Sequence, residues 1–94
     1  MDIKTLQYLE ERAAKGRAIV NKIETMLNAV ERAKKARNIE IYTASGGSIF
    51  ITELNKAGEL PNDPRTHLSA LMVNVFIDNT LHQVRDLEAE LAAL

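Results

Sequence analysis

The 94-residue chain contains no cysteine and no tryptophan, and it has only two prolines and four glycines. Without cysteine, disulfides and thiolate metal sites are excluded, and the chain suits a reducing compartment. Proline and glycine are the residues that most often interrupt helices, and all of them except Gly16 lie between positions 46 and 64. Long uninterrupted stretches therefore remain on both sides of the middle of the chain.

Neither sign of charge dominates, since 12 basic and 13 acidic residues give a formal net charge of −1. This balance gives no electrostatic reason for the whole chain to bind nucleic acid or an anionic membrane. No apolar run approaches the roughly 18 residues that suggest a membrane span, and Met1–Lys4 does not begin a signal peptide. We therefore expect a cytoplasmic protein that contacts no membrane, and the composition disfavours nucleic acid as a partner.

Residues 2–37 are predicted to form the first helix, with Asp2 as the N-cap that accepts the first free backbone amides. Apolar residues recur at the seven-residue spacing of a coiled coil, in which positions a and d face a partner helix. The small residues Ala13 and Gly16 indicate either a close approach of the two helices, which we favour, or a hinge or a groove for a partner. The predicted contact residues are Leu6, Ala13, Val20, Leu27 and Lys34 at position a, and Leu9, Gly16, Ile23, Val30 and Arg37 at position d. Ile19, Met26 and Ala33 widen this stripe at position g.

Residues 39–53 are predicted to form a β-hairpin around Ser45–Gly47. A three-residue loop with Gly47 in the left-handed conformation places Ile41 opposite Ile51 on one face, which we expect to be core. A two-stranded ribbon is only marginally stable in water, so this hairpin needs an apolar surface to lie on. The sequence therefore predicts assembly.

The other face of the hairpin carries Tyr42 opposite Phe50, two of only four aromatic residues in the chain. Two interpretations fit such a cross-strand aromatic pair. The rings pack on a helix or on another subunit, or they form a stacking platform for a base or another ring ligand.

A loop is predicted over residues 54–63, followed by a second helix over residues 64–93 in which Asp63 is the N-cap and Pro64 the first helical residue. The predicted fold is a single domain, residues 1–94, of the α+β class and mainly α. In it a two-stranded β-hairpin is inserted between the helices of a long, antiparallel, coiled-coil-like helical hairpin. The residues of the second helix at a and d spacing are Ala70, Val73, Ile77, Thr80, Val84, Leu87, Leu91 and Leu94.

The second helix also carries apolar residues away from these positions, and from Leu68 to Ile77 only Ser69 and Asn74 are polar. A helix that is apolar nearly all round must be buried all round, and one partner helix with a thin hairpin cannot cover it. The sequence therefore predicts a homo-oligomer. The predicted interface residues are Leu68, Leu71, Met72, Val75 and Phe76.

Cations gather at the end of the first helix and the start of the second. They either complement the dipole at the helix C-terminus and aid solubility, or they line a site for an anionic, nucleotide-like ligand together with the hairpin aromatics. The residues of this candidate ligand site are Arg32, Lys34, Arg37, Tyr42, Phe50 and Arg65.

These features favour a non-enzymatic, homo-oligomeric interaction module that binds or inhibits a protein partner, an architecture typical of small phage inhibitors of host proteins. The alternative is an oligomer that sequesters an anionic small molecule at its subunit boundaries. An enzyme that uses Asp78 and His82 is disfavoured, because the sequence offers no nucleophile and no third polar group beside this pair. We expect no cofactor and no metal.

Overall fold

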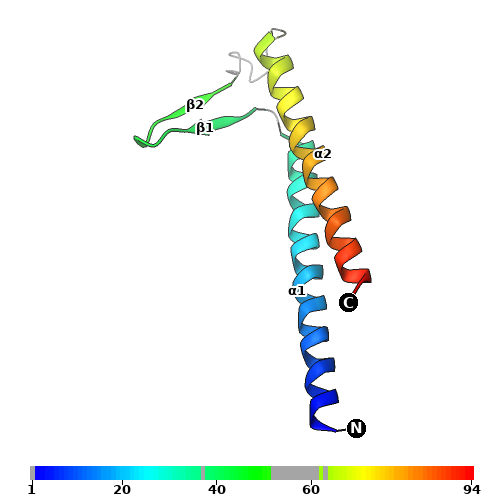
Figure 1. The fold of residues 1–94 in the computed structure, drawn as a ribbon. Helices are drawn as coiled ribbons and strands as arrows, with labels where there is room; N and C mark the ends of the chain where they lie inside the picture. Colours follow the sequence, from blue (N-terminus) through cyan, green and yellow to red (C-terminus); the bar gives the residue numbers. More distant parts are fainter. Residues whose placement is uncertain (1, 37, 52–61, 63) are drawn as a thin grey trace.

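Two helices and a small sheet make up the computed structural model, which describes residues 2–36, 38–51, 62 and 64–94. The helices lie side by side and antiparallel, and the sheet projects sideways near one end of the pair (Figure 1). The predicted mainly helical fold with a small antiparallel sheet between two helices is confirmed. The predicted loop lies outside the described residues, apart from Asn62. The elements are α1 (Ile3–Lys34), β1 (Glu40–Tyr42), β2 (Ser48–Phe50) and α2 (Pro64–Ala92).

Both helices begin where the capping signals place them. The side chain of Asp2 accepts a hydrogen bond of 2.7 Å from the backbone N–H of Thr5, and the extended backbone of Asp2 is typical of an N-cap. Pro64 is the first residue of α2, as predicted, while its expected cap Asp63 lies outside the described residues. Neither described helix is long and apolar enough to cross a bilayer.

The face that α1 presents to α2 is narrower than the predicted one, because it consists of the predicted d and g positions from Gly16 to Ala33 without the a positions. The predicted a-position residues Leu6, Val20 and Leu27 are exposed, so their assignment to the contact is wrong. The contact ends at Ala33 of position g and leaves Lys34 of position a exposed, which avoids removing an ammonium group from water. The α1 residues that are buried or half-buried on this side, here called the α1 contact face, are Gly16, Ile19, Ile23, Met26, Val30 and Ala33.

In α2 the predicted contact positions from Val73 to Leu94 are buried or half-buried. Val84 of α2 is only 3% exposed, and Val30 of α1 is similarly buried. The core of the molecule therefore lies between the two helices, where each of these valines packs against the other helix. At the end of α2 nearest the hairpin, the buried position is shifted by one residue from the prediction. Ser69 is buried there, whereas Ala70, which was predicted to face α1, is exposed.

The two helices are staggered along their axes. The guanidinium group of Arg12 donates a hydrogen bond to the carbonyl oxygen of Leu94, and Gly16 lies beside Leu91 and Leu94. The first turns of α1 therefore extend past the end of α2 (Figure 1). The molecule measures 68 × 28 × 20 Å and has a radius of gyration of 20.1 Å. A compact chain of this length would have a radius of gyration of about 12 Å.

The strands pair in a register that differs from the predicted one by two residues. Ile41 lies opposite Ile49 rather than Ile51, and the backbone N–H of Ile51 bonds to the carbonyl of Ile39 at 2.9 Å. The observed register makes two isoleucine pairs, 39 with 51 and 41 with 49, where the predicted one made a single pair. Because the shift is two residues, each side chain keeps its predicted face.

The loop glycine was also predicted one position too late. Gly46 adopts the left-handed conformation with φ of 92°, and Gly47 does not, so the prediction for Gly47 is wrong. The N–H of Gly46 bonds to the carbonyl of Thr43 at 3.1 Å, and the N–H of Thr43 bonds to the carbonyl of Gly47 at 2.8 Å. The three-residue loop therefore consists of Ala44, Ser45 and Gly46.

Candidate functional site

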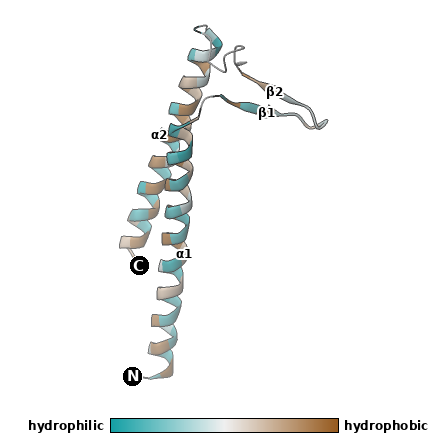
Figure 2. Cartoon of the chain, turned by 180° about the vertical axis from the view of Figure 1, so that it is seen from behind, coloured by the Kyte–Doolittle hydropathy of each residue, from teal (hydrophilic) through white to brown (hydrophobic). Residues whose placement is uncertain are grey.

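The predicted interface residues of α2 form an exposed apolar surface on its first half. The exposed fraction of these side chains ranges from 37% for Met72 to 67% for Val75. Hydrophobic segments, brown in Figure 2, are accordingly not confined to the contact between the helices. We call this surface, which consists of Leu68, Leu71, Met72, Val75 and Phe76, the α2 apolar surface.

An apolar groove lies at the edge of this surface, where the chain leaves α1 for the hairpin. Its volume is ≈ 340 Å³. We call it the junction groove, and its lining residues are Ala33, Ala36, Ile39, Met72, Val73 and Phe76. Met72 and Phe76 belong to both features, so the groove and the α2 apolar surface are continuous.

The isoleucine face of the hairpin continues from the junction groove. Ile39 and Ile51 at the base are half-buried, whereas Ile41 and Ile49 nearer the tip are exposed, Ile49 to 59%. The expectation that this face is core is therefore wrong within a single chain, because the hairpin projects away from both helices (Figure 1). An apolar ridge thus adjoins an apolar groove on the same molecule.

The opposite face of the hairpin carries the two aromatic side chains. Tyr42 is 77% exposed, and its hydroxyl donates a hydrogen bond of 3.2 Å to the carboxylate of Glu40. This hydrogen bond and the negative charge of Glu40 raise the pKa of Tyr42. Phe50 lies opposite Glu40 rather than opposite Tyr42, so the two rings are diagonal neighbours.

The predicted cationic site is only partly assembled. The ammonium group of Lys34 pairs with the carboxylate of Glu31 at 3.0 Å, which offsets its charge locally. Arg32 and Arg65 are exposed, and Arg37 lies outside the described residues. Tyr42 and Phe50 lie on the projecting hairpin, and neither belongs to the lining of the described pocket that Lys34 lines.

Lys34 does line a pocket of ≈ 180 Å³ between the end of α1 and the start of α2. The hydroxyl of Ser69 at this pocket has no hydrogen-bond partner among the described residues, but the side chain is buried and its oxygen is closed to solvent. A ligand could not reach it without movement of the helices. The polar residues of the lining are Lys34, Asn38, Thr66, Ser69 and Asn74.

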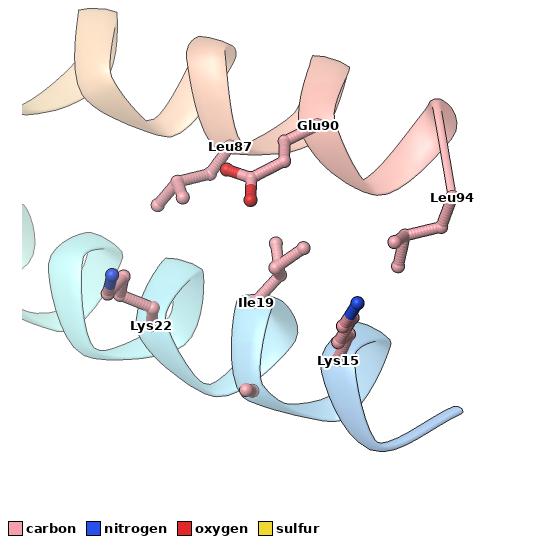
Figure 3. A pocket seen from close by; sticks show the side chains of 7 residues that line it. Lys15, Ile19, Lys22, Leu87, Glu90 and Leu94 are labelled. Carbon is pink, nitrogen blue, oxygen red and sulfur yellow. The ribbon is translucent and has the colours of Figure 1, made fainter. Parts of the chain in front are cut away.

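Sequence reasoning missed a second polar feature at the other end of the helical pair. Here a pocket of ≈ 270 Å³ has an apolar floor that includes Ile19 and Leu87. Figure 3 shows Leu87 and Glu90 of α2 on one side of this pocket and Ile19 of α1 on the other, with Lys15 and Lys22 to either side of Ile19. The only sequence signal is the seven-residue spacing of the two lysines, which is common on solvated helix faces.

The part of the chain that the structure describes holds no cluster of three histidine, aspartate or glutamate side chains that could bind a metal ion. Asp78 and His82 are both exposed on α2. The chain matches no protein-family model, and it shows no significant similarity to a curated protein or to a solved structure.

Proposed function

We propose that the chain is a non-enzymatic, homo-oligomeric interaction module built on a coiled-coil-like helical hairpin. The observation that supports this proposal is the surface of the single chain, which exposes 7439 Å². A compact monomer of 10.5 kDa would expose about 5,400 Å². The difference of about 2,000 Å² exceeds the roughly 800 Å² that each partner buries in a typical stable interface.

The apolar surfaces favour a second copy of the chain as the molecule that covers them. The ridge made by Ile41 and Ile49 adjoins the junction groove, so one surface carries both a projection and a recess. Two copies related by a two-fold axis would each insert the ridge into the groove of the other, because such an interface uses the same patch twice. The α2 apolar surface, continuous with the groove, would be covered in the same contact.

The test is a double substitution, Met72→Glu with Val75→Glu, examined by multi-angle light scattering and circular dichroism. Buried unpaired carboxylates are strongly unfavourable, so we expect the mass to fall to the 10.5 kDa of one chain while the helical signal is retained. The matched control is Leu6→Glu with Tyr8→Glu, which adds the same charge at exposed residues far from the hairpin. A mass of 10.5 kDa for the unaltered protein at low micromolar concentration contradicts the proposal.

A second candidate function is the sequestering of an anionic, nucleotide-like ligand. The specific observation in its favour is the pocket at Lys34, whose lining contains one cation and no carboxylate. A nucleotide at a hundredfold excess over its dissociation constant should stabilise the fold by about 2.7 kcal/mol in a thermal-shift screen. Lys34→Gln should abolish that shift, and Lys35→Gln, at a neighbouring exposed residue outside the pocket, should not.

A further inference from the structure

Among the described residues, the backbone hydrogen bonds of the hairpin leave both of its edges open. Thr43 bonds to Gly47 and Ile51 bonds to Ile39, so the odd-numbered residues 39, 41 and 43 direct their backbone groups towards the partner strand. Bonding residues alternate along an antiparallel pair. The backbone N–H and C=O groups of Glu40 and Tyr42 therefore point outward at the β1 edge, and those of Ser48 and Phe50 point outward at the β2 edge.

These outward-bonding residues also carry the side chains of the aromatic face. Glu40, Tyr42, Ser48 and Phe50 share this face, while the isoleucines occupy the other. Glu40 is the only charged residue from 38 to 51, and among the described residues no cation lies within ion-pair distance of it. The β1 edge thus combines free backbone groups, the carboxylate of Glu40 and the exposed ring of Tyr42.

We propose that the β1 edge binds an extended basic segment of a protein partner as a third strand. The added strand would place an arginine or lysine side chain next to Glu40, where it would lie within reach of the ring of Tyr42. Main-chain hydrogen bonds supply affinity in such strand addition, and alternate side chains supply specificity. An opposite-charge cross-strand pair and a cation over an aromatic ring are both favourable.

The charge pattern distinguishes this occupant and this edge from the alternatives. An acidic segment would place a carboxylate beside Glu40, and like charges directly opposite each other destabilise a sheet. The β2 edge offers the same backbone groups but only Ser48 and Phe50, with no charge to select a cation. The inference rests on the proposed interaction module, in which the isoleucine face is covered and the aromatic face stays accessible.

The test uses two nine-residue probe peptides, one of alternating valine and arginine and one of alternating valine and glutamate. Each is titrated into the full chain, and amide hydrogen exchange is followed by NMR. We expect only the arginine peptide to bind and to protect the amides of Glu40 and Tyr42, with those of Ser48 and Phe50 unchanged. Equal binding of both peptides, or protection confined to the β2 edge, overturns the proposal.

Three substitutions identify the groups responsible. Glu40→Gln should weaken binding of the arginine peptide about fivefold, the scale of one cross-strand ion pair, while Glu24→Gln on α1 should leave it unchanged. Ser48→Pro removes an outward N–H from the β2 edge only and should also leave binding unchanged. Protection of the Thr43 and Ile51 amides shows in each variant that the hairpin remains folded. Undiminished binding to the Glu40→Gln variant overturns the proposal.

Light scattering on the same samples separates this inference from the proposed oligomer. A chain of 10.5 kDa that still binds the arginine peptide at β1 would contradict the oligomer and support the strand addition. An oligomer that does not bind the arginine peptide would support the proposed oligomer and contradict the strand addition. If the Glu40 and Tyr42 amides are protected without peptide and lose protection on dilution, a second copy occupies the edge, and the basic partner is excluded.

Discussion

Val30 of α1 is 2% exposed and Ile49 of β2 is 59% exposed, although both are branched apolar residues in regular secondary structure. The difference arises from what each element packs against within its own chain. The two helices pack against each other, and their contact faces are buried along most of the shared length. The hairpin contacts neither helix along its strands, so its apolar face remains available to another molecule.

This comparison implies that the two regions respond independently to substitution. The described hydrogen bonds of the hairpin strands and loop stay within the hairpin, from Ile39 to Ile51. Sites far apart with no shared partners usually have additive effects. A change in the helical core should therefore leave the hairpin intact, and the reverse should also hold.

We expect the largest loss in the free energy of unfolding from Val30→Ala. The matched control is Val75→Ala, which makes the same substitution at an exposed valine of α2. Val30 is buried between the helices, so removal of its methyl groups should lower the free energy of unfolding by roughly 2 kcal/mol. Val75 is 67% exposed within the chain, and its replacement should cost less than about 0.5 kcal/mol. Urea denaturation followed by circular dichroism measures both.

The dependence on protein concentration sharpens this comparison. A loss of stability in Val75→Ala that is largest at high protein concentration and shrinks as the protein is diluted would locate Val75 in the contact between copies, because association stabilises by mass action. Equal losses in the two variants at every concentration would show that the helical pair has a different core from the one described.

A smaller and more local effect is expected from Gly46→Ala. Its φ of 92° is strained for any residue with a Cβ atom, at a cost of about 1–2 kcal/mol. The hairpin should open, with faster exchange of the Thr43 and Ile51 amides, while the melting temperature of the helices stays the same. A lower melting temperature of the helices would contradict the independence of the two regions.

Gly16→Ala is the matched control in the helical pair. An added methyl group would lie 3.7 Å from the side chain of Leu94 and 3.8 Å from that of Leu91, which are ordinary contact distances. Alanine favours a helix over glycine by up to about 1 kcal/mol. The same substitution should thus stabilise the helices at Gly16 and destabilise the hairpin at Gly46.

The features that could be predicted from the sequence are those fixed by local chemistry. Asp2 and Pro64 set the helix starts, and the positions from Val73 to Leu94 set the face of α2, because capping and helical periodicity depend on nearby residues. The face of α1 was predicted too broadly, because apolar residues at positions a, d and g offered two overlapping contact faces, of which only the one made by d and g forms the contact. The partner helix selected the one that keeps Lys34 in solvent.

The hairpin register could not be fixed in the same way. With Gly46 and Gly47 adjacent, either residue can supply the left-handed loop conformation, and the two choices differ by two residues in pairing. The only sequence criterion that distinguishes the two registers is the number of isoleucine pairs, which is two in the observed register and one in the predicted register. For the candidate site, exposure of the α2 apolar surface followed from composition, whereas the junction groove depends on where the hairpin leaves α1.

The smallest effects concern pH, and they should have opposite signs in the two regions. The backbone N–H of Thr5 donates to the carboxylate of Asp2 and lowers its pKa in the folded chain. Cap stability is therefore present above the unfolded pKa and is lost as pH falls through the folded pKa. The amide of Thr5 should exchange faster in acid relative to Asp2→Asn, in which the capping side chain does not titrate. An identical acid response in the two proteins would contradict a role for the Asp2 charge.

Tyr42 should show the reverse behaviour, because its hydrogen bond to Glu40 and the charge of that carboxylate raise its pKa. The contribution of this bond to hairpin stability is present below the unfolded pKa and is lost as pH rises through the folded pKa. In a Tyr8→Phe background, Tyr42 is the only tyrosine, so ultraviolet absorbance reports its ionisation directly. Adding Glu40→Gln should move that ionisation to lower pH, whereas adding Glu24→Gln on α1 should not. Identical titrations with and without Glu40 would show that the 3.2 Å contact does not persist in solution, and the aromatic face would then lack the arrangement on which cation recognition depends.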